Sequence, residues 1–361
     1  FDAAADYITA RLVKAGLKPG GDNGSFRQHY DLHETRVDTN AASLEIGGRR
    51  FAFGADFAMR SLARPLNGEF PVVYAGHGWV IPGQSIDPYA NVDVRGKIVL
   101  VHGPNTLPKG VTIQQLGRIT VGATAPFAAA AARGAAGVMF ITRAADLIRW
   151  DELKNSNTIR RELEPAVASA YAALPITSLL LTPPVTTALL EGEAMTGPAA
   201  MRLGEPADYP ASFELKKKIT VRVATSAPTV HRPCNVVAIL EGSDPKLKDE
   251  AITVFSHLDG AVGSREIAGD RVYNSADDNA SGSAAVLSIA EQMAAAPKPK
   301  RTIVFVWDSG EEQGLWGTRR FVHAPPVPLD RIVAHFNVDM IGASRRTGAD
   351  SASTGVTERN E

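Results

Sequence analysis

The stretch TIVFVWDSGEEQGLWG, residues 302–317, decides the fold class of this chain. Its first half is a continuous apolar and β-branched run, which is typical of a strand buried on both faces. A helix is expected upstream of it, from about residue 281 to 296, because Pro297 stops the helical pattern. Strands that alternate with helices predict an α/β fold, with a mixed, mostly parallel sheet covered by helices on both faces. Three more runs of the buried-strand type lie nearby: NVVAILEG (235–242), AITVFSHLDG (251–260) and IVAHFNVDM (332–340).

The rest of the chain divides into zones of different composition. Residues 216–361 hold the α/β pattern, and residues 1–60, which open with the helical stretch FDAAADYITARLVKAG, are expected to be the N-terminal part of the same domain. Residues 61–215 are rich in Gly, Pro and Ala and carry short β runs such as PVVYAG and KIVLVHG, which predicts an inserted β-rich module. The chain starts without Met and ends in the polar stretch GADSASTGVTERNE, so we expect a trimmed chain in which the C-terminal part of the α/β domain is missing.

The bulk composition excludes several classes of protein. The 361 residues carry a formal net charge of −1, which gives no electrostatic reason to expect nucleic acid or an anionic membrane as a partner. No apolar run reaches the roughly 18–20 residues that a membrane span needs. Cys234 is the only cysteine, so an internal disulfide and a cysteine-based zinc site are excluded.

Acidic and imidazole side chains follow three of the predicted strands, at the points where those strands end. The carboxyl ends of strands in an open α/β sheet form one edge, where ligands bind, so these side chains are expected to converge. Asp277 lies before the start of the predicted helix, where the helix dipole favours a carboxylate. The residues at the three strand ends are His257 and Asp259, then Asp308, Glu311 and Glu312, and finally Asp339.

If they converge, the four carboxylates of Asp277, Glu311, Glu312 and Asp339 surround the imidazole of His257. Such a cluster cannot stay fully ionised without a cation. Imidazole with carboxylates suits zinc, manganese or cobalt better than calcium, and the number of ligands favours two metals that share a carboxylate. Asp259, two residues after His257 in an extended segment, is placed to hold the imidazole ring and fix its tautomer.

Each residue also has a simpler interpretation. A histidine at the end of a buried strand is often structural, and residues 277–279 alone are most simply a helix N-cap. The sequence DSG at 308–310 looks like an aspartic-protease loop, but no second copy is present. Residues 277–288 begin like a calcium loop, but Ser288 occupies the position that requires Glu. The metal interpretation therefore depends on four features that occur together at one sheet edge.

The motifs SHLDG, SADDNASG, RTIVFVWDSGEEQGLWG and NVDMIG resemble the family of co-catalytic dizinc aminopeptidases, which also contains glutamate carboxypeptidase II and the transferrin receptor. Residues 61–215 resemble the protease-associated domain that is often inserted in that family. The resemblance implies that His257 and Asp339 hold one zinc ion, that Asp277 bridges two ions, and that Glu312 holds the second. It also implies a cis peptide bond between Asp277 and Asp278. The second zinc site would lack a ligand, because the family supplies a histidine after the position of Asp339 and this chain has none there.

The resemblance implies a zinc-dependent exopeptidase, foremost an aminopeptidase that removes N-terminal residues from peptides through a bridging water activated by two metals and the general base Glu311. A glutamate-carboxypeptidase-like enzyme and a non-catalytic scaffold relative are the alternatives. Peptides are the expected partners, and no oligomeric state is predicted. Export to the periplasm or the exterior is expected from the family.

Overall fold

The computed structural model describes residues 1–103, 106–116, 122–164, 167, 176–203, 208–260, 269–270, 272 and 274–342. The chain forms two compact units. The first comprises Phe1–Leu32, Leu163–Ser169 and His231–Glu361, and the second comprises His33–Glu162 and Ala170–Val230.

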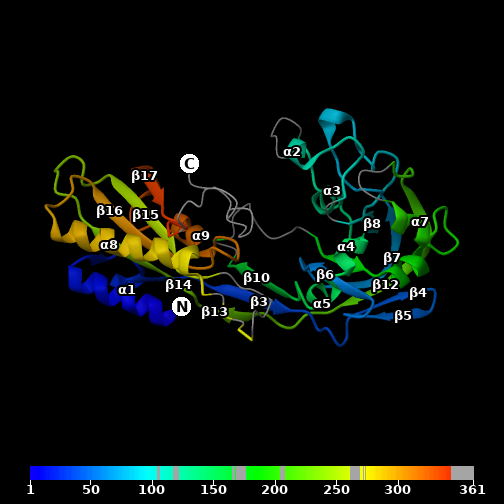
Figure 1. The fold of residues 1–361 in the computed structure, drawn as a ribbon, viewed down its shortest axis with the longest axis horizontal. Coiled ribbons are helices and arrows are strands. Elements are labelled where there is room, and N and C mark those ends of the chain that lie inside the picture. Colours follow the sequence, from blue (N-terminus) through cyan, green and yellow to red (C-terminus); the bar gives the residue numbers. More distant parts are fainter. Residues whose placement is uncertain are drawn as a thin grey trace, which may run out of the picture. The chain divides into compact units, whose positions relative to one another are not determined.

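The first unit is built on a mixed sheet, which confirms the predicted α/β class. Its described strands follow the order β1-β14-β16-β15-β17, with β2 also paired to β14. Figure 1 labels β14, β15, β16 and β17 of this sheet. Strand β15 is parallel to both β16 and β17, whereas β14 is antiparallel to β1, β2 and β16. Parallel pairs are therefore not the majority among the described strands, since the short strands β1 and β2 add antiparallel pairs that the sequence does not reveal. The elements are α1 (Asp2–Ala15), β1 (Lys18–Pro19), η1 (Asp22–Gly24), β2 (Arg27–His29), β14 (Cys234–Leu240), β15 (Ala251–His257), η4 (Ala276–Ser281), α8 (Gly282–Ala295), β16 (Thr302–Asp308), α9 (Trp316–His323), η5 (Leu329–Arg331) and β17 (Ile332–Asn337).

Helices α1 and α8 cover one face of this sheet (Figure 1). Helix α1 forms because its apolar residues recur at helical spacing, and it ends at Gly16, whose φ of 79° suits a residue without a side chain. Alternate strand residues point to the helices, as the two-residue period of a strand requires. The shared core contains Ala5, Ile8 and Leu12 of α1, Val236 and Ala238 of β14, Phe305 and Trp307 of β16, and Val286, Leu287 and Ala290 of α8.

The opposite face carries a smaller core, in which Val237, Val304 and Val306 pack with Phe255 and with Phe321 of α9. Strand β17 contributes less to it than its apolar sequence predicts, because Val333 and Phe336 are 51% and 57% exposed. Complete helical cover of both faces of the sheet remains a prediction.

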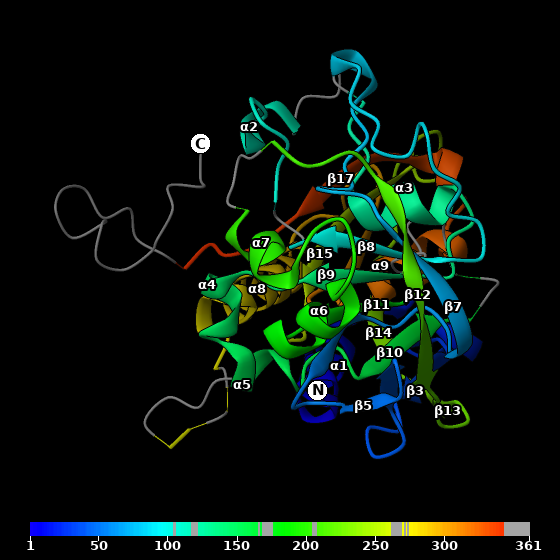
Figure 2. The same cartoon turned by 90° about the vertical axis from the view of Figure 1, so that its right-hand side faces the viewer.

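The second unit is built on an eight-stranded sheet with the order β5-β4-β12-β7-β8-β9-β11-β6 in the described residues. Figure 2 shows β12 and β7 side by side, as their antiparallel pairing requires. A three-stranded sheet, β10-β3-β13, contains residues at which the chain passes from one unit to the other. The elements are β3 (Leu32–Arg36), β4 (Ser43–Ile46), β5 (Arg49–Ala52), β6 (Phe57–Ser61), β7 (Leu66–Tyr74), η2 (Pro82–Gln84), β8 (Ile98–His102), α2 (Ile113–Leu116), α3 (Pro126–Ala132), β9 (Gly137–Ile141), α4 (Ala144–Leu147), α5 (Trp150–Leu153), β10 (Ile159–Leu163), β11 (Ser178–Leu181), α6 (Pro183–Leu190), α7 (Gly197–Arg202), β12 (Phe213–Val223) and β13 (Thr229–His231).

This second unit extends beyond the predicted insert, residues 61–215, at both ends. Strand β4 pairs with β12, and β6 pairs with β11, so segments before residue 61 belong to the sheet of the second unit. That the unit is a protease-associated domain remains a prediction. Among the described residues, no helix combines the length and the apolar character needed to cross a membrane.

Candidate metal centre

His257 ends β15, which lies between β16 and β17, and its side chain is 2% exposed. Its Nδ1 lies 2.9 Å from the main-chain oxygen of Asp259. Because a carbonyl oxygen only accepts, Nδ1 carries the hydrogen, and Nε2 of the neutral ring presents its lone pair on the other side. Burial acts to lower the pKa of His257, but the hydrogen bond to Asp259 and the negative charge of Asp339 leave it raised.

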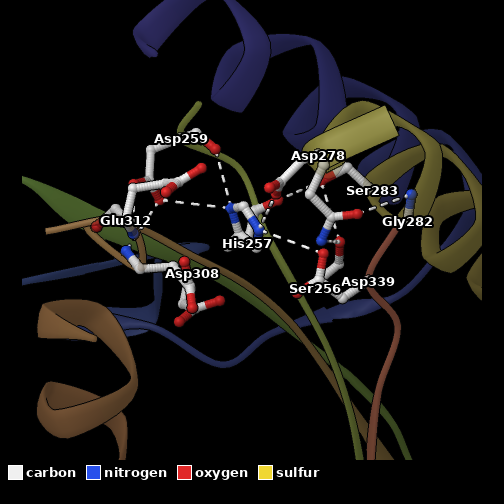
Figure 3. A network of polar contacts seen from close by, with 12 residues as sticks. Ser256, His257, Asp259, Asp278, Gly282, Ser283, Asp308, Glu312 and Asp339 are labelled. Atoms are coloured by element: carbon white, nitrogen blue, oxygen red, sulfur yellow. Dashed lines mark hydrogen bonds and ion pairs between the residues drawn. The ribbon is translucent and has the colours of Figure 1, made fainter. Parts of the chain in front are cut away.

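Two carboxylates face Nε2 of His257 (Figure 3). Oδ1 of Asp278 lies 3.1 Å from Nε2, and Oδ1 of Asp339 lies 3.5 Å from it. One ligand atom from each of the three residues lies within 4.8 Å of the others. Within the described part of the chain, this is the only group of histidine, cysteine and acidic side chains close enough to share one ion.

Three polar atoms in and beside this group are buried without a hydrogen-bond partner: His257 Nε2, Asp339 Oδ1 and Glu312 Oε1. Buried polar atoms in folded proteins normally have partners, so three such atoms together need an explanation. Each one has a lone pair that could bind a cation. The combination of imidazole and carboxylate oxygens fits zinc.

Asp259 contacts the segment that carries the two glutamates. Its Oδ1 accepts a hydrogen bond from the main-chain N of Glu311 at 3.1 Å, and its Oδ2 accepts one from that of Glu312 at 3.3 Å. The predicted contact with the imidazole ring is made by the main-chain oxygen of Asp259, because its carboxylate is turned toward Glu311 and Glu312 and lies 4.0 Å from Nδ1. Asp259 thus connects the end of β15 to the loop after β16.

Burial and neighbouring charge perturb both glutamates. The pKa of Glu311 is raised, first by burial and then by the negative charges of Asp339 and Asp259, while His257 acts to lower it. The pKa of Glu312 is also raised, again first by burial and then by the negative charge of Asp278. The carboxylate of Asp278 therefore lies against His257 Nε2 and also raises the pKa of Glu312.

Asp277, the predicted bridging residue, is not part of this group. Its Oδ1 accepts hydrogen bonds from the main-chain N of Gly342 at 2.7 Å and from Ser281 Oγ at 3.1 Å. The position facing His257 belongs to Asp278. The cis peptide bond also lies one residue later than predicted, between Asp278 and Asn279.

Asp308, in the loop that looks like an aspartic-protease motif, makes a structural contact with α9. It is 3% exposed, and its carboxylate accepts a hydrogen bond from the hydroxyl of Thr318 in α9. Burial raises its pKa to about 6, although the Thr318 contact acts in the opposite direction. Asp308 thus links the end of β16 to α9.

Known proteins resemble the segment that carries these residues. Residues 235–358 match the model of Peptidase family M28. Leupeptin-inactivating enzyme 1 of Streptomyces exfoliatus is 33% identical over 111 residues, which are 30% of this chain and 23% of that protein. A probable leucine aminopeptidase of Arthroderma otae is 31% identical over 134 residues, which are 34% of this chain and 36% of that protein.

Among solved structures, an aminopeptidase from Aneurinibacillus sp. strain AM-1 aligns with 94% of this chain and 64% of its own, at 18% identity and a TM-score of 0.49. This chain spans less than two thirds of the length of each of these three proteins. The family match covers the ends of β15, β16 and β17, where the candidate metal centre lies. Residues 235–358 are thus similar in sequence to Peptidase family M28, which confirms the resemblance predicted from the motifs.

Proposed function

We propose that this chain is the metal-bearing part of a zinc-dependent aminopeptidase. The observation that carries the proposal is the group of His257, Asp278 and Asp339, whose ligand atoms converge beside two glutamates with raised pKa values. The name of the relative from Arthroderma otae, a probable leucine aminopeptidase, supports an aminopeptidase over a carboxypeptidase.

In this proposal, His257 and Asp339 would hold one zinc ion, and Asp278 would be the shared ligand in place of Asp277, for which the resemblance implied that role. Glu312 holds a second ion, which fits its unpartnered Oε1 and the influence of Asp278 on its pKa. Bound zinc would polarise the scissile carbonyl and make water more acidic. Among the residues described, the second ion has only Asp278 and Glu312 as ligands, so it needs further donors.

Glu311 is the general base in this proposal. A base that takes a proton from the attacking water and passes it to the leaving amine needs a pKa closer to neutrality than that of an ordinary glutamate. Burial acts on the pKa of Glu311 in that direction. Asp259 fixes the main chain at Glu311, so the position of the carboxylate is set by a hydrogen bond from the end of β15.

The test uses the purified 361-residue chain, with zinc binding measured by equilibrium dialysis and hydrolysis by leucyl-4-nitroanilide. Glu311→Gln should retain zinc and lose turnover by roughly 10²–10⁴-fold, the usual contribution of a general base. Glu250→Gln is the matched control, because Glu250 pairs with Arg301 just before β15 begins. It should change neither property.

A panel of free and N-acetylated dipeptides separates the alternatives. An aminopeptidase cleaves only the free ones, whereas a glutamate-carboxypeptidase-like enzyme accepts a blocked N-terminus. Zinc binding without any turnover would favour a non-catalytic relative. Turnover that survives a strong chelator or the Glu311→Gln change would refute the proposed mechanism.

A further inference from the structure

The side chain of Asn279 occupies a buried position between the three segments that carry His257, Asp278 and Asp339. It is 2% exposed. Its Nδ2 donates to Ser256 Oγ at 3.1 Å and to the main-chain oxygen of Val338 at 3.1 Å. Its Oδ1 accepts from the main-chain N of Gly282 at 3.1 Å and from that of Met340 at 3.3 Å.

Three of these four contacts lie next in sequence to a member of the metal group. Ser256 immediately precedes His257 at the end of β15, and Figure 3 shows Ser256 and His257 near Asp339. Val338 and Met340 flank Asp339, and Asn279 itself follows Asp278. One amide therefore links the ends of β15 and β17 to the start of α8.

The chemistry of this position favours asparagine. A primary amide has two N–H donors and an oxygen that accepts two hydrogen bonds, and all four are used here. A carboxylate would place an oxygen instead of a donor against the carbonyl of Val338. A serine hydroxyl has a single hydrogen to donate and a shorter side chain. The surroundings are also tight, since a Cβ on Gly282 would lie 2.3 Å from both Asn279 Oδ1 and Val338 O.

We propose that Asn279 is a positioning residue that sets the zinc affinity of the centre by holding the His257, Asp278 and Asp339 segments in place before the ion binds. This inference rests on the proposed function, because it assumes that the three side chains are zinc ligands. Residues that orient metal ligands without touching the ion commonly change metal affinity by about 10–100-fold when they are removed.

The alternative is that Asn279 stabilises the fold with no particular effect on the ligands. The two roles differ in what they change. A purely structural residue lowers the unfolding temperature and leaves the zinc dissociation constant of the folded protein unchanged. A positioning residue changes the dissociation constant and the coordination geometry of the bound ion.

The experiment compares the wild-type 361-residue chain with Asn279→Ala, Ser256→Ala and Thr302→Val. The zinc dissociation constant is measured by competition with a chromophoric chelator, the unfolding temperature by circular dichroism, and the coordination geometry by the visible absorption spectrum of the cobalt-substituted protein. Thr302→Val is the matched control. Thr302 begins β16, and its hydroxyl links Lys248 and Gly242 through two hydrogen bonds away from the ligands.

We expect Asn279→Ala to weaken zinc binding by about 10–100-fold and to alter the cobalt spectrum. Ser256→Ala, which removes one of the four contacts, should weaken binding by a smaller factor. Thr302→Val should lower the unfolding temperature and leave both metal readouts unchanged. If Asn279→Ala does not fold, Ser256→Ala carries the test.

Zinc binding by a folded Asn279→Ala chain as tight as that of the wild type would overturn the inference, as would an unchanged dissociation constant in Ser256→Ala. These outcomes leave the proposed function intact. A wild-type chain that binds no zinc would instead refute the proposed function, and the inference with it.

Discussion

Asp277 and Asp278 are adjacent in sequence, but their carboxylates make different contacts. Replacing each with asparagine in turn tests which of the two binds zinc. Asp278 Oδ1 lies 3.1 Å from Nε2 of His257, whereas Asp277 Oδ1 accepts from the main-chain N of Gly342. Asp278→Asn replaces a negatively charged carboxylate ligand with a neutral amide, whose oxygen is a much weaker ligand for zinc. Asp277→Asn keeps an oxygen that still accepts from Gly342. We therefore expect only Asp278→Asn to weaken zinc binding.

The magnitude follows from ligand-linked stability. Zinc at 1,000 times its dissociation constant stabilises a folded protein by about 4.1 kcal/mol. Loss of a ligand should weaken binding by at least about 100-fold, the upper end of the effect of residues that only orient ligands. At the same zinc concentration, Asp278→Asn then retains about 1.4 kcal/mol of stabilisation and loses about 2.7 kcal/mol. For a unit of this size, that loss corresponds to roughly 5–11 °C in the zinc-induced shift of the unfolding temperature.

The assay is thermal unfolding of both variants and the wild type, with zinc and with a chelator. Asp277→Asn should keep the zinc-induced shift, and its stability without zinc should change by no more than about 1 kcal/mol, because a hydrogen bond of ordinary strength is at stake. The opposite pattern, in which Asp277→Asn loses the zinc-induced shift and Asp278→Asn keeps it, would show that Asp277 is the zinc ligand. It would refute the assignment of that role to Asp278.

Three further changes test other parts of the structure. Gly282→Ala should lower stability by about 1–3 kcal/mol, measured by urea unfolding, because its Cβ would overlap with Asn279 Oδ1 and a main-chain oxygen. Burial lowers the pKa of His102 to about 4 in the folded protein, against about 6.5 in the unfolded chain. The free energy of unfolding is therefore highest above pH 6.5. It falls as the pH drops toward 4, because the unfolded chain binds the proton first. Between pH 7.5 and 4.5 the loss should be roughly 2–3 kcal/mol by urea unfolding, and His102→Gln should remove that part of the pH dependence. Tyr30→Phe should cost about 1 kcal/mol by the same measurement, since the buried hydroxyl lies 2.8 Å from Ser309 Oγ, and an unchanged value would show that this contact contributes nothing.

The sequence predicts where the centre lies because strand ends are visible in it. Three runs of apolar residues end in His257, in the segment with Glu311 and Glu312, and shortly before Asp339. Neighbouring parallel strands put their carboxyl ends at one edge, and β15 is indeed parallel to both β16 and β17. The convergence of His257 and Asp339 follows from this topology alone. The residue types and the strand directions were therefore sufficient to predict that His257 and Asp339 lie close together.

Strand direction does not predict which of Asp277 and Asp278 faces His257. Both carboxylates precede one helix, and both are equally suited to its N-terminus. The outcome depends on the backbone of the turn Ala276–Ser281, where Asp278 has φ −103° and ψ 88°, far from helical values. A pattern of residue types does not contain those torsion angles. For the same reason, the sequence indicates a helix cap for residues 277–279 and misses the four contacts of Asn279.

The second unit extends beyond the predicted insert, residues 61–215, for a different reason. Its limits depend on pairing between strands that are distant in sequence. Strand β4 is a short strand of four residues, SLEI, and it lies in the second unit because Leu44 and Ile46 pair with Val221 and Ile219 of β12. The sequence does not reveal this pairing, because the two strands are far apart along the chain. Composition reveals only that the middle of the chain is rich in Gly and Pro. Composition therefore predicts the existence of a second unit, and long-range strand pairing sets its limits.

The centre concentrates like charges, and neutral polar groups around it hold the segments that carry these charges. Carboxylates from Asp278, Asp339, Glu311 and Glu312 surround a single imidazole, and their repulsion favours moving the segments apart. The carboxylate of Asp259 and the neutral amide of Asn279, with its four hydrogen bonds, both oppose this movement. Asn279→Asp would add another negative charge and remove two donors at once, so the same position would then add to the repulsion. A neutral amide at the junction of the ligand segments is therefore what a site needs if its carboxylates are to be in place before the cation arrives.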